Sequence, residues 1–138
     1  MENTQNEDLL EALIRSTSRI LSGVSQLLRE YGLCTTEFAV LEAIHALGPQ
    51  PIQKVAERVL VTSGSMTHTV DQMIAKGLIV RVRCTRDARR FYLHLTPEGS
   101  RVIEAALPKH NAYIAEIFAP LSAEEKTSVT QALAPLMR

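Results

Sequence analysis

The sequence predicts a mainly α-helical chain with one small β-hairpin, and three observations support this fold class. Apolar residues recur at three- and four-residue steps through most of the 138 residues, which is the spacing of one face of a helix. Two short segments instead alternate apolar and polar residues on either side of an arginine-rich turn, as paired strands do. Glycines and capping residues separate these patterns, and the length favours a single domain.

The composition excludes several classes of protein. With 46% hydrophobic and 22% charged residues, the chain is globular. It has no apolar run near the roughly 20 residues that span a membrane, and its acidic start is unlike a signal peptide, so we expect a cytoplasmic protein. Its two cysteines, Cys34 and Cys84, have no partners at zinc spacing. We therefore expect no disulfide, no metal and no cofactor.

The first predicted helix runs from Glu7 to Tyr31 and ends near Gly32. Its apolar stripe is wide and consists of Leu9, Leu10, Leu13, Ile14, Thr17, Ile20, Leu21, Val24, Leu27 and Leu28. A long amphipathic helix needs a surface to cover such a stripe. We expect part of it to face the core and part to face another subunit.

The next segments predict a helix-turn-helix. Thr35 or Thr36 caps a helix that Gly48 and Pro49 end. A short helix over 51–59, a turn over 60–62 and a further helix from Ser63 to the C′ glycine Gly77 follow. Two short helices joined by a tight turn are the signature of a helix-turn-helix, in which the second helix is the recognition helix.

A hairpin and further helices complete the predicted fold. Residues 78–83 and 91–95 alternate around the turn CTRDARR, which predicts a wing, with Arg81 and His94 on its exposed face and without a function. Thr96 and Pro97 open a helix through Leu107 that Pro108 kinks or breaks. The last predicted helix begins with a capping box at 122–125 and continues through Leu133 and Leu136.

These motifs resemble the multiple-antibiotic-resistance regulator (MarR) family. The matching pieces are TTEFAVLEAI, IQKVAERVLVTSGSMTHTVDQMIAKGLIVR and the wing RDARRFYLHLTPEG, whose D-x-R core is Asp87 and Arg89. The resemblance implies a homodimer joined by helices at about 7–31 and 100–138, with a DNA-binding lobe at about 35–99. It also implies a repressor of a palindromic operator, released by a small, often aromatic or phenolic, ligand or by thiol oxidation.

The charges are concentrated in the same region. The chain has no net charge, yet the segment from Lys54 to Arg101 holds nine basic and four acidic residues. This segment carries +5 and the remainder −5. A basic middle between acidic ends is typical of a localised anion-binding face on a neutral scaffold.

Short polar side chains mark the predicted recognition helix. The residues that point away from its apolar face are Ser63, Ser65, Thr67, His68 and also Gln72. Hydroxyl groups at a helix N-terminus can contact phosphate or base edges, and in the resembling family the matching positions contact operator DNA. The alternatives are that Ser63 is simply an N-cap and that the threonines are surface residues.

Arginines mark the predicted wing, whose candidate DNA-binding residues are Arg83, Arg86, Asp87, Arg89 and Arg90. A guanidinium suits the narrow, electronegative minor groove. In the resembling family the arginine of D-x-R inserts there while the aspartate holds the wing's shape, and these roles fall on Arg89 and Asp87. The alternative is a solvated charged turn.

The sequence also contains candidate regulatory residues. Cys84 lies beside Arg83 and Arg86, and flanking guanidiniums favour the reactive thiolate. Cys84 is therefore a candidate redox sensor, against the alternative of an inert thiol, whereas Cys34 reads as core filler. In the family, ligands often bind at the junction of the dimer helices and the DNA lobe, where we place Tyr31, His45 and Tyr113. For His45 the alternative is a partly buried helix residue.

Two other classes of function remain. A winged-helix module for protein–protein assembly would have no need of four arginines in the wing or of a serine- and threonine-rich recognition helix. An enzyme is not indicated, because no nucleophile–base pair, phosphate loop or metal motif is present. The sequence therefore favours a DNA-binding transcriptional regulator.

Overall fold

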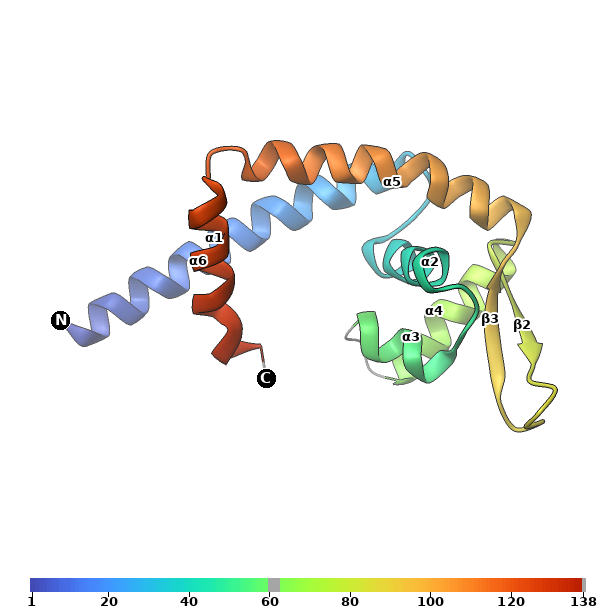
Figure 1. Cartoon of the computed structure of the whole chain (residues 1–138). Coiled ribbons are helices and arrows are strands. Elements are labelled where there is room, and N and C mark those ends of the chain that lie inside the picture. The colour runs from blue at the N-terminus through green and yellow to red at the C-terminus, as the bar shows by residue number, and fades with distance from the viewer. Residues whose placement is uncertain (60–62, 138) are drawn as a thin grey trace.

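The structure is a computed structural model that describes residues 1–59 and 63–137. Figure 1 shows the long helices over 2–29 and 97–118, here called the arm, above a lobe that holds the shorter central helices and the hairpin. In chain order the elements are α1 (Glu2–Arg29), α2 (Thr35–Leu47), β1 (Gln50–Pro51), α3 (Ile52–Val59), α4 (Ser63–Ala75), β2 (Ile79–Arg83), β3 (Phe91–Leu95), α5 (Pro97–Phe118), α6 (Ala123–Leu133) and the 3-10 helix η1 (Ala134–Leu136). The predicted fold class is confirmed; the predicted turn at 60–62 lies outside the described residues.

One hydrophobic core joins the arm to the lobe. It is formed by buried side chains from every layer, including Leu28, Phe38, Leu41, Val55, Met66, Val70, Met73, Ile79, Leu93 and Ile103. The N-terminal half of α1 and the whole of α6 contribute nothing buried to it. Figure 1 shows these segments projecting away from the lobe. The core therefore fixes α2, α3, α4 and the hairpin beneath the inner halves of α1 and α5.

The first two helices differ from the prediction at their N-terminal ends. α1 begins at Glu2 rather than Glu7, because the polar residues that precede Glu7 are compatible with a helix. The N-cap of α2 is Cys34, not Thr35 or Thr36: its thiol accepts a hydrogen bond from the Glu37 amide. The prediction that Cys34 fills the core is also wrong, since a capping residue at this end of α2 lies at the surface and Cys34 is exposed.

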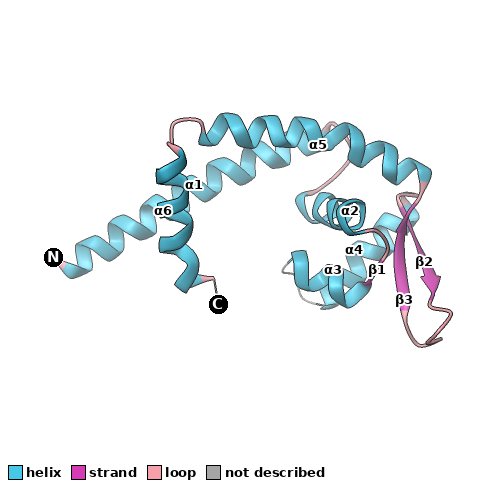
Figure 2. Ribbon diagram, viewed as in Figure 1, coloured by secondary structure: helices cyan, strands magenta, loops and turns pink. Residues whose placement is uncertain are grey.

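The sheet has three strands, not the two of the predicted hairpin (Figure 2). β3 pairs with β2 on one side and with the two-residue β1 on the other, both antiparallel. The register sets Arg81 opposite the buried Leu93 and His94 opposite Val80. Arg81 and His94 therefore lie on opposite faces of the sheet, and the prediction that they share the exposed face is wrong. Val80 and Val82 are exposed, which the alternation did not indicate.

Pro108 does not end its helix. α5 continues from Pro97 to Phe118 with Pro108 inside it. Pro108 lies on the exposed side, where water can satisfy the carbonyl that loses its amide partner. The predicted opening of α5 is confirmed, because Thr96 accepts a hydrogen bond from the Gly99 amide and Pro97 follows it. The capping box of Ser122 and Glu125 is confirmed as well.

A tight turn connects α4 to β2. Gly77 has a φ of 75°, a left-handed conformation that glycine adopts at little cost. The amides of Gly77 and Leu78 donate to the carbonyls of Ile74 and Met73 at 3.0 Å each, which closes the helix end. Thr96, which caps α5, donates from its hydroxyl to the Gly77 carbonyl at 2.6 Å and from its amide to the Leu78 carbonyl at 3.1 Å. The turn is therefore attached to the start of α5.

Among the described residues, no helix combines the length and the apolar character that crossing a membrane would require.

Gly99 is predicted to be essential for this attachment. A Cβ added at Gly99 would lie 2.0 Å from the Leu78 carbonyl oxygen. We expect Gly99→Ala to lower the free energy of unfolding by about 1–3 kcal/mol, the usual cost of overpacking, as measured by chemical denaturation.

Gly23→Ala is the matched control for Gly99→Ala. The atoms nearest to a Cβ at Gly23 would be the hydroxyl and ring atoms of Tyr113, a side chain that can move. Its destabilisation should therefore be smaller. Equal losses in the two variants would contradict the assigned role of the Leu78 carbonyl.

Candidate nucleic-acid interface

The helix α4 buries one face and exposes the other. Met66, Val70 and Met73 are fully buried, as their spacing predicted. Ser65, Thr67, His68 and Gln72 are all exposed. Ser63 is the first residue of α4, and its side chain lies outside the described part of the chain. The polar face that could contact DNA is thus formed by the predicted residues for which side chains are described.

Asp87 organises the tip of the wing. Its carboxylate accepts a hydrogen bond from the Arg89 amide at 3.0 Å and lies 3.5 Å from the Arg89 Nε. The Arg90 amide donates to the Asp87 carbonyl, and the Cys84 amide donates to the Arg90 carbonyl. These bonds close the turn between β2 and β3. Asp87 thus accepts hydrogen bonds within the turn that carries Arg89.

The wing arginines extend into solvent. The side chain of Arg89 is 94% exposed, although its backbone is held by Asp87. Arg83 lies over the ring of Phe91, 5.5 Å from its centroid, and Arg86 is exposed. An anchored backbone with an extended guanidinium is well suited to reach a phosphate or a groove floor, because little ordering of the backbone remains to be done on binding.

An ion pair connects the wing to α4. The Arg81 Nη2 lies 2.7 Å from the Asp71 Oδ1. Because Arg81 is on β2 and Asp71 on α4, the pair links the two elements that would contact DNA. The sequence analysis gave Arg81 no role. Pairing the two strands in the correct register would have placed Arg81 opposite Leu93, on the inner face of β3. That placement is the signal for a structural role of Arg81.

The two cysteines differ in exposure. Cys84 is half-buried at the end of β2. It lines a shallow, open recess on the wing together with Val82, Arg83, Thr85, Arg86, Tyr92 and His94. Cys34 is exposed at the start of α2. The described residues contain no cluster of three or more histidine, cysteine or acidic groups suited to a metal ion.

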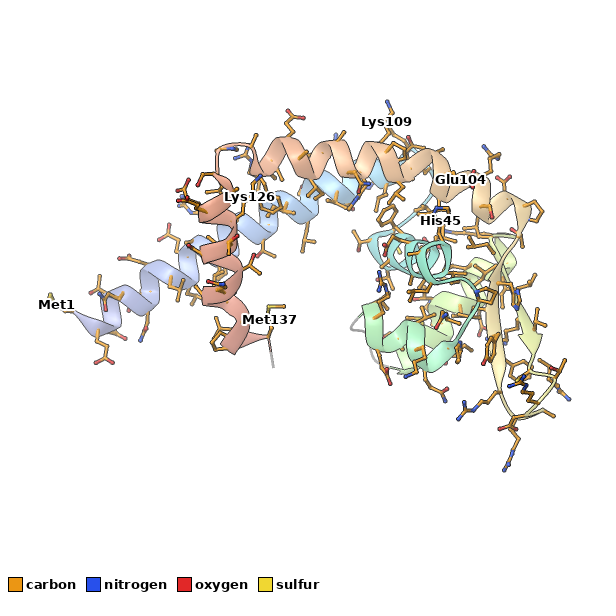
Figure 3. The ribbon with its side chains drawn as sticks, in the orientation of Figure 1. Met1, His45, Glu104, Lys109, Lys126 and Met137 are labelled. Carbon is orange, nitrogen blue, oxygen red and sulfur yellow. The ribbon has the colours of Figure 1, made fainter. Side chains whose placement is uncertain are left out.

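The three candidate effector residues occupy different places. Tyr113 on α5 is half-buried, and its hydroxyl donates to the Arg19 carbonyl of α1 at 3.4 Å. Tyr31, just after α1, packs against the core. His45 is exposed on α2, not partly buried (Figure 3). Near the same helices the ring of His110 lies 4.5 Å from that of Phe38, a contact the sequence analysis missed. Within the described part of the chain, no hydrogen bond or ring contact joins Tyr31, His45 and Tyr113, so a shared pocket stays a prediction.

These elements define a winged helix-turn-helix protein, and known proteins share its sequence and fold. The family model for the MarR family matches residues 33–91. The HTH-type transcriptional regulator MhqR of Bacillus subtilis is 34% identical over 125 residues, which is 91% of this chain and 86% of MhqR. The uncharacterised HTH-type transcriptional regulator YkoM of the same bacterium is 38% identical over 98 residues. That match covers 71% of this chain and 64% of YkoM, slightly less than two thirds of its length.

Solved structures agree in fold. A mutant MarR from E. coli in complex with operator DNA has a TM-score of 0.85 and 18% identity, covering 95% of this chain and 94% of that one. An organohalide-sensing regulator, RdhR, in a form bound to 2,4-dichlorophenol, has a TM-score of 0.85 and 21% identity, covering 96% and 79%. The chain belongs to the MarR family of transcriptional regulators.

Proposed function

We propose that the protein is a homodimeric repressor that binds a palindromic DNA operator and is released by a small aromatic or phenolic ligand or by thiol oxidation. The exposed face of α4 enters the major groove, and Arg89 reaches the adjacent minor groove. The observation that carries the proposal is the wing tip, where Asp87 holds the backbone of Arg89 while its side chain is 94% exposed.

The distribution of the other groups supports DNA as the partner. Ser65, Thr67 and His68 are exposed on α4, and the Arg81–Asp71 pair links that helix to the wing. A relative in fold was solved with operator DNA. The competing function, a winged-helix module for protein assembly, gives no account of exposed arginines at a wing tip that is itself held by hydrogen bonds.

Titration of duplex DNA tests the proposal. The duplex is selected from a random pool by the wild-type protein, and the dissociation constant is measured at several salt concentrations. Affinity should fall steeply with salt because phosphate contacts release counterions. Arg89→Ala should weaken binding by about 1–3 kcal/mol, the scale of a specific groove contact.

Lys109→Ala provides the control for Arg89→Ala. It also removes one positive charge, from an exposed position on α5 that points away from the lobe in Figure 3, and it should leave the affinity unchanged. Absent or salt-insensitive binding by the wild type would overturn DNA recognition. An unchanged constant for Arg89→Ala would remove Arg89 from the interface.

Exposed apolar side chains on the arm, on α6 and near the C-terminus support a homodimer. They are Leu9, Leu10, Ile14 and Leu21 on α1, Val129 on α6 and, close to the C-terminus, Leu136 and Met137. Exposed apolar side chains are often covered at a subunit interface. We propose that a second copy of the chain covers it.

Sedimentation analysis tests the homodimer. The wild type should have twice the chain mass, and Leu10→Arg should shift it towards the monomer. Leu47→Arg is the matched control, because Leu47 on α2 is 54% exposed and Leu10 is 58% exposed, yet Leu47 lies outside the arm. A monomeric wild type, or the same shift in both variants, would rule out this interface.

In this proposal, Cys84 is the thiol that senses oxidation. Peroxide would add one oxygen to the thiolate, giving a sulfenic acid, beside the arginines of the wing. We expect peroxide to release DNA from the wild type and from Cys34→Ser but not from Cys84→Ser. If Cys84→Ser is released like the wild type, Cys84 is not the sensor. In that case a phenolic ligand, as in the dichlorophenol-bound relative, becomes the candidate to test by thermal shift.

A further inference from the structure

Lys76 occupies the turn between the two elements that would read DNA. It directly follows the last residue of α4, and β2 begins three residues later at Ile79. Its amide donates to the Gln72 carbonyl at 3.0 Å, so its backbone still belongs to the helix end. Its side chain contacts Gly32, just after α1, and Glu37 of α2, and is 45% exposed.

The Lys76 ammonium binds a buried carboxylate. Its Nζ lies 2.7 Å from the Oε2 of Glu37, whose side chain is 4% exposed. The other carboxylate oxygen of Glu37 accepts from the Cys34 amide at 2.9 Å. Burial raises the pKa of Glu37, but the hydrogen bonds from Lys76 and Cys34 outweigh it, and the pKa is lowered overall. Glu37 is therefore a buried charge with a partner on each oxygen.

The same ammonium also reaches the end of α1. The Lys76 Nζ donates to the Gly32 carbonyl at 3.2 Å. One side chain thus joins the segment that follows α1, the first turn of α2 and the last turn of α4. On the other side of the turn Thr96, the cap of α5, holds Gly77 and Leu78. The junction of α4 and β2 is consequently attached to both helices of the arm.

Loss of the Lys76 bridge would destabilise the structure around Glu37. A buried carboxylate that loses its cation is strongly disfavoured, so Glu37 would have to move or take up water. The core beneath α4, formed by Met66, Val70 and Met73, does not depend on the bridge. Loss of Lys76 should therefore loosen the orientation of α4 and β2 without unfolding the lobe.

We propose that Lys76 is a positioning residue for operator recognition. By bridging Glu37 and the Gly32 carbonyl, it holds the junction of recognition helix and wing in the orientation that lets α4 and Arg89 contact DNA together. The proposal rests on the proposed function, since it concerns the accuracy of DNA reading. It needs no contact between Lys76 and DNA.

A competing role for Lys76 is a direct contact with a DNA phosphate. The variant Glu37→Gln distinguishes this role from positioning, because the two roles predict opposite changes in DNA affinity. Glutamine offers one acceptor oxygen where Glu37 uses two, so the variant releases Lys76 and removes one negative charge from the protein. If Lys76 were a phosphate contact, Glu37→Gln would bind DNA more tightly. If Lys76 positions the junction, Glu37→Gln binds more weakly.

The experiment measures dissociation constants for the selected duplex and for a scrambled duplex of the same length. Lys76→Met and Glu37→Gln should each weaken the selected duplex about tenfold, and the double variant should be no weaker than either single variant. Binding of the scrambled duplex should change by less than about twofold, because Lys76 does not contact the phosphates and non-specific binding does not need a fixed orientation of α4 and the wing. Lys76→Arg, which keeps a cationic donor, should recover most of the affinity, and Lys109→Met should have no effect.

Lys76→Met decides the proposal. An unchanged ratio of selected to scrambled binding overturns it, as does tighter binding by Glu37→Gln or a hundredfold loss in the double variant. Circular dichroism confirms that each variant is folded at the assay temperature; if Glu37→Gln is not, the ratio for Lys76→Met and its recovery in Lys76→Arg still decide. A wild type that shows no preference for any selected duplex defeats the proposed function instead.

Discussion

The short connection between α4 and β2 constrains everything else in the lobe. The helix ends at Ala75 and the strand begins at Ile79, so neither can be reoriented without the other. Gly77 makes the reversal through its positive φ, and the Leu78 carbonyl receives the first amide of the α5 cap. The close approach of Gly99 to that carbonyl then fixes where α5 starts. Recognition helix, wing and arm are thus set by one turn.

The role of each charged side chain in this protein depends on where it lies and on whether it is paired, not on the net charge. The chain is neutral overall, and many of its charges are already paired. Arg81 is paired with Asp71, and Lys76 with Glu37, so these cations hold the structure together. Arg89 differs, because its pair with Asp87 is long at 3.5 Å and its side chain is almost wholly exposed. Fewer cations are therefore available to bind an anion than the nine basic residues between Lys54 and Arg101 indicate. Arg89 at the wing tip is one of those that remain available.

Much of the fold could be predicted from the sequence, because its signals are local. The period of apolar residues located the helices, and Thr96 with Pro97 marked the start of α5. Some failures were local, such as the start of α1 and the N-cap of α2. Others concern contacts between distant residues. The pairing of β1 with β3 involves two residues and has no pattern of its own. The role of Arg81 depends on its register opposite Leu93, and alternation alone gave the wrong face.

The residues of the candidate DNA-binding surface could be predicted from the sequence. The residues that hold this surface in place were harder to predict. The exposed residues of α4 followed from the helical period, and the D-x-R pattern led to Asp87 and Arg89. The sequence patterns assigned no role to Glu37. Its burial and its bond to Lys76 join positions 39 residues apart, which periodicity cannot detect. The Cys34 cap was missed for another reason, because a thiol is not among the usual capping groups.

A hydroxyl-radical footprint of the wild-type protein on its selected duplex tests the central claim most directly, because these radicals attack the sugars along the minor groove. The account predicts two symmetric protected blocks flanking the centre of the site, spaced by about one helical turn of 10 base pairs or a multiple of it, and their loss in Arg89→Ala. A single unsymmetrical block, or protection that persists in Arg89→Ala, would contradict a dimer that reads the minor groove through its wings.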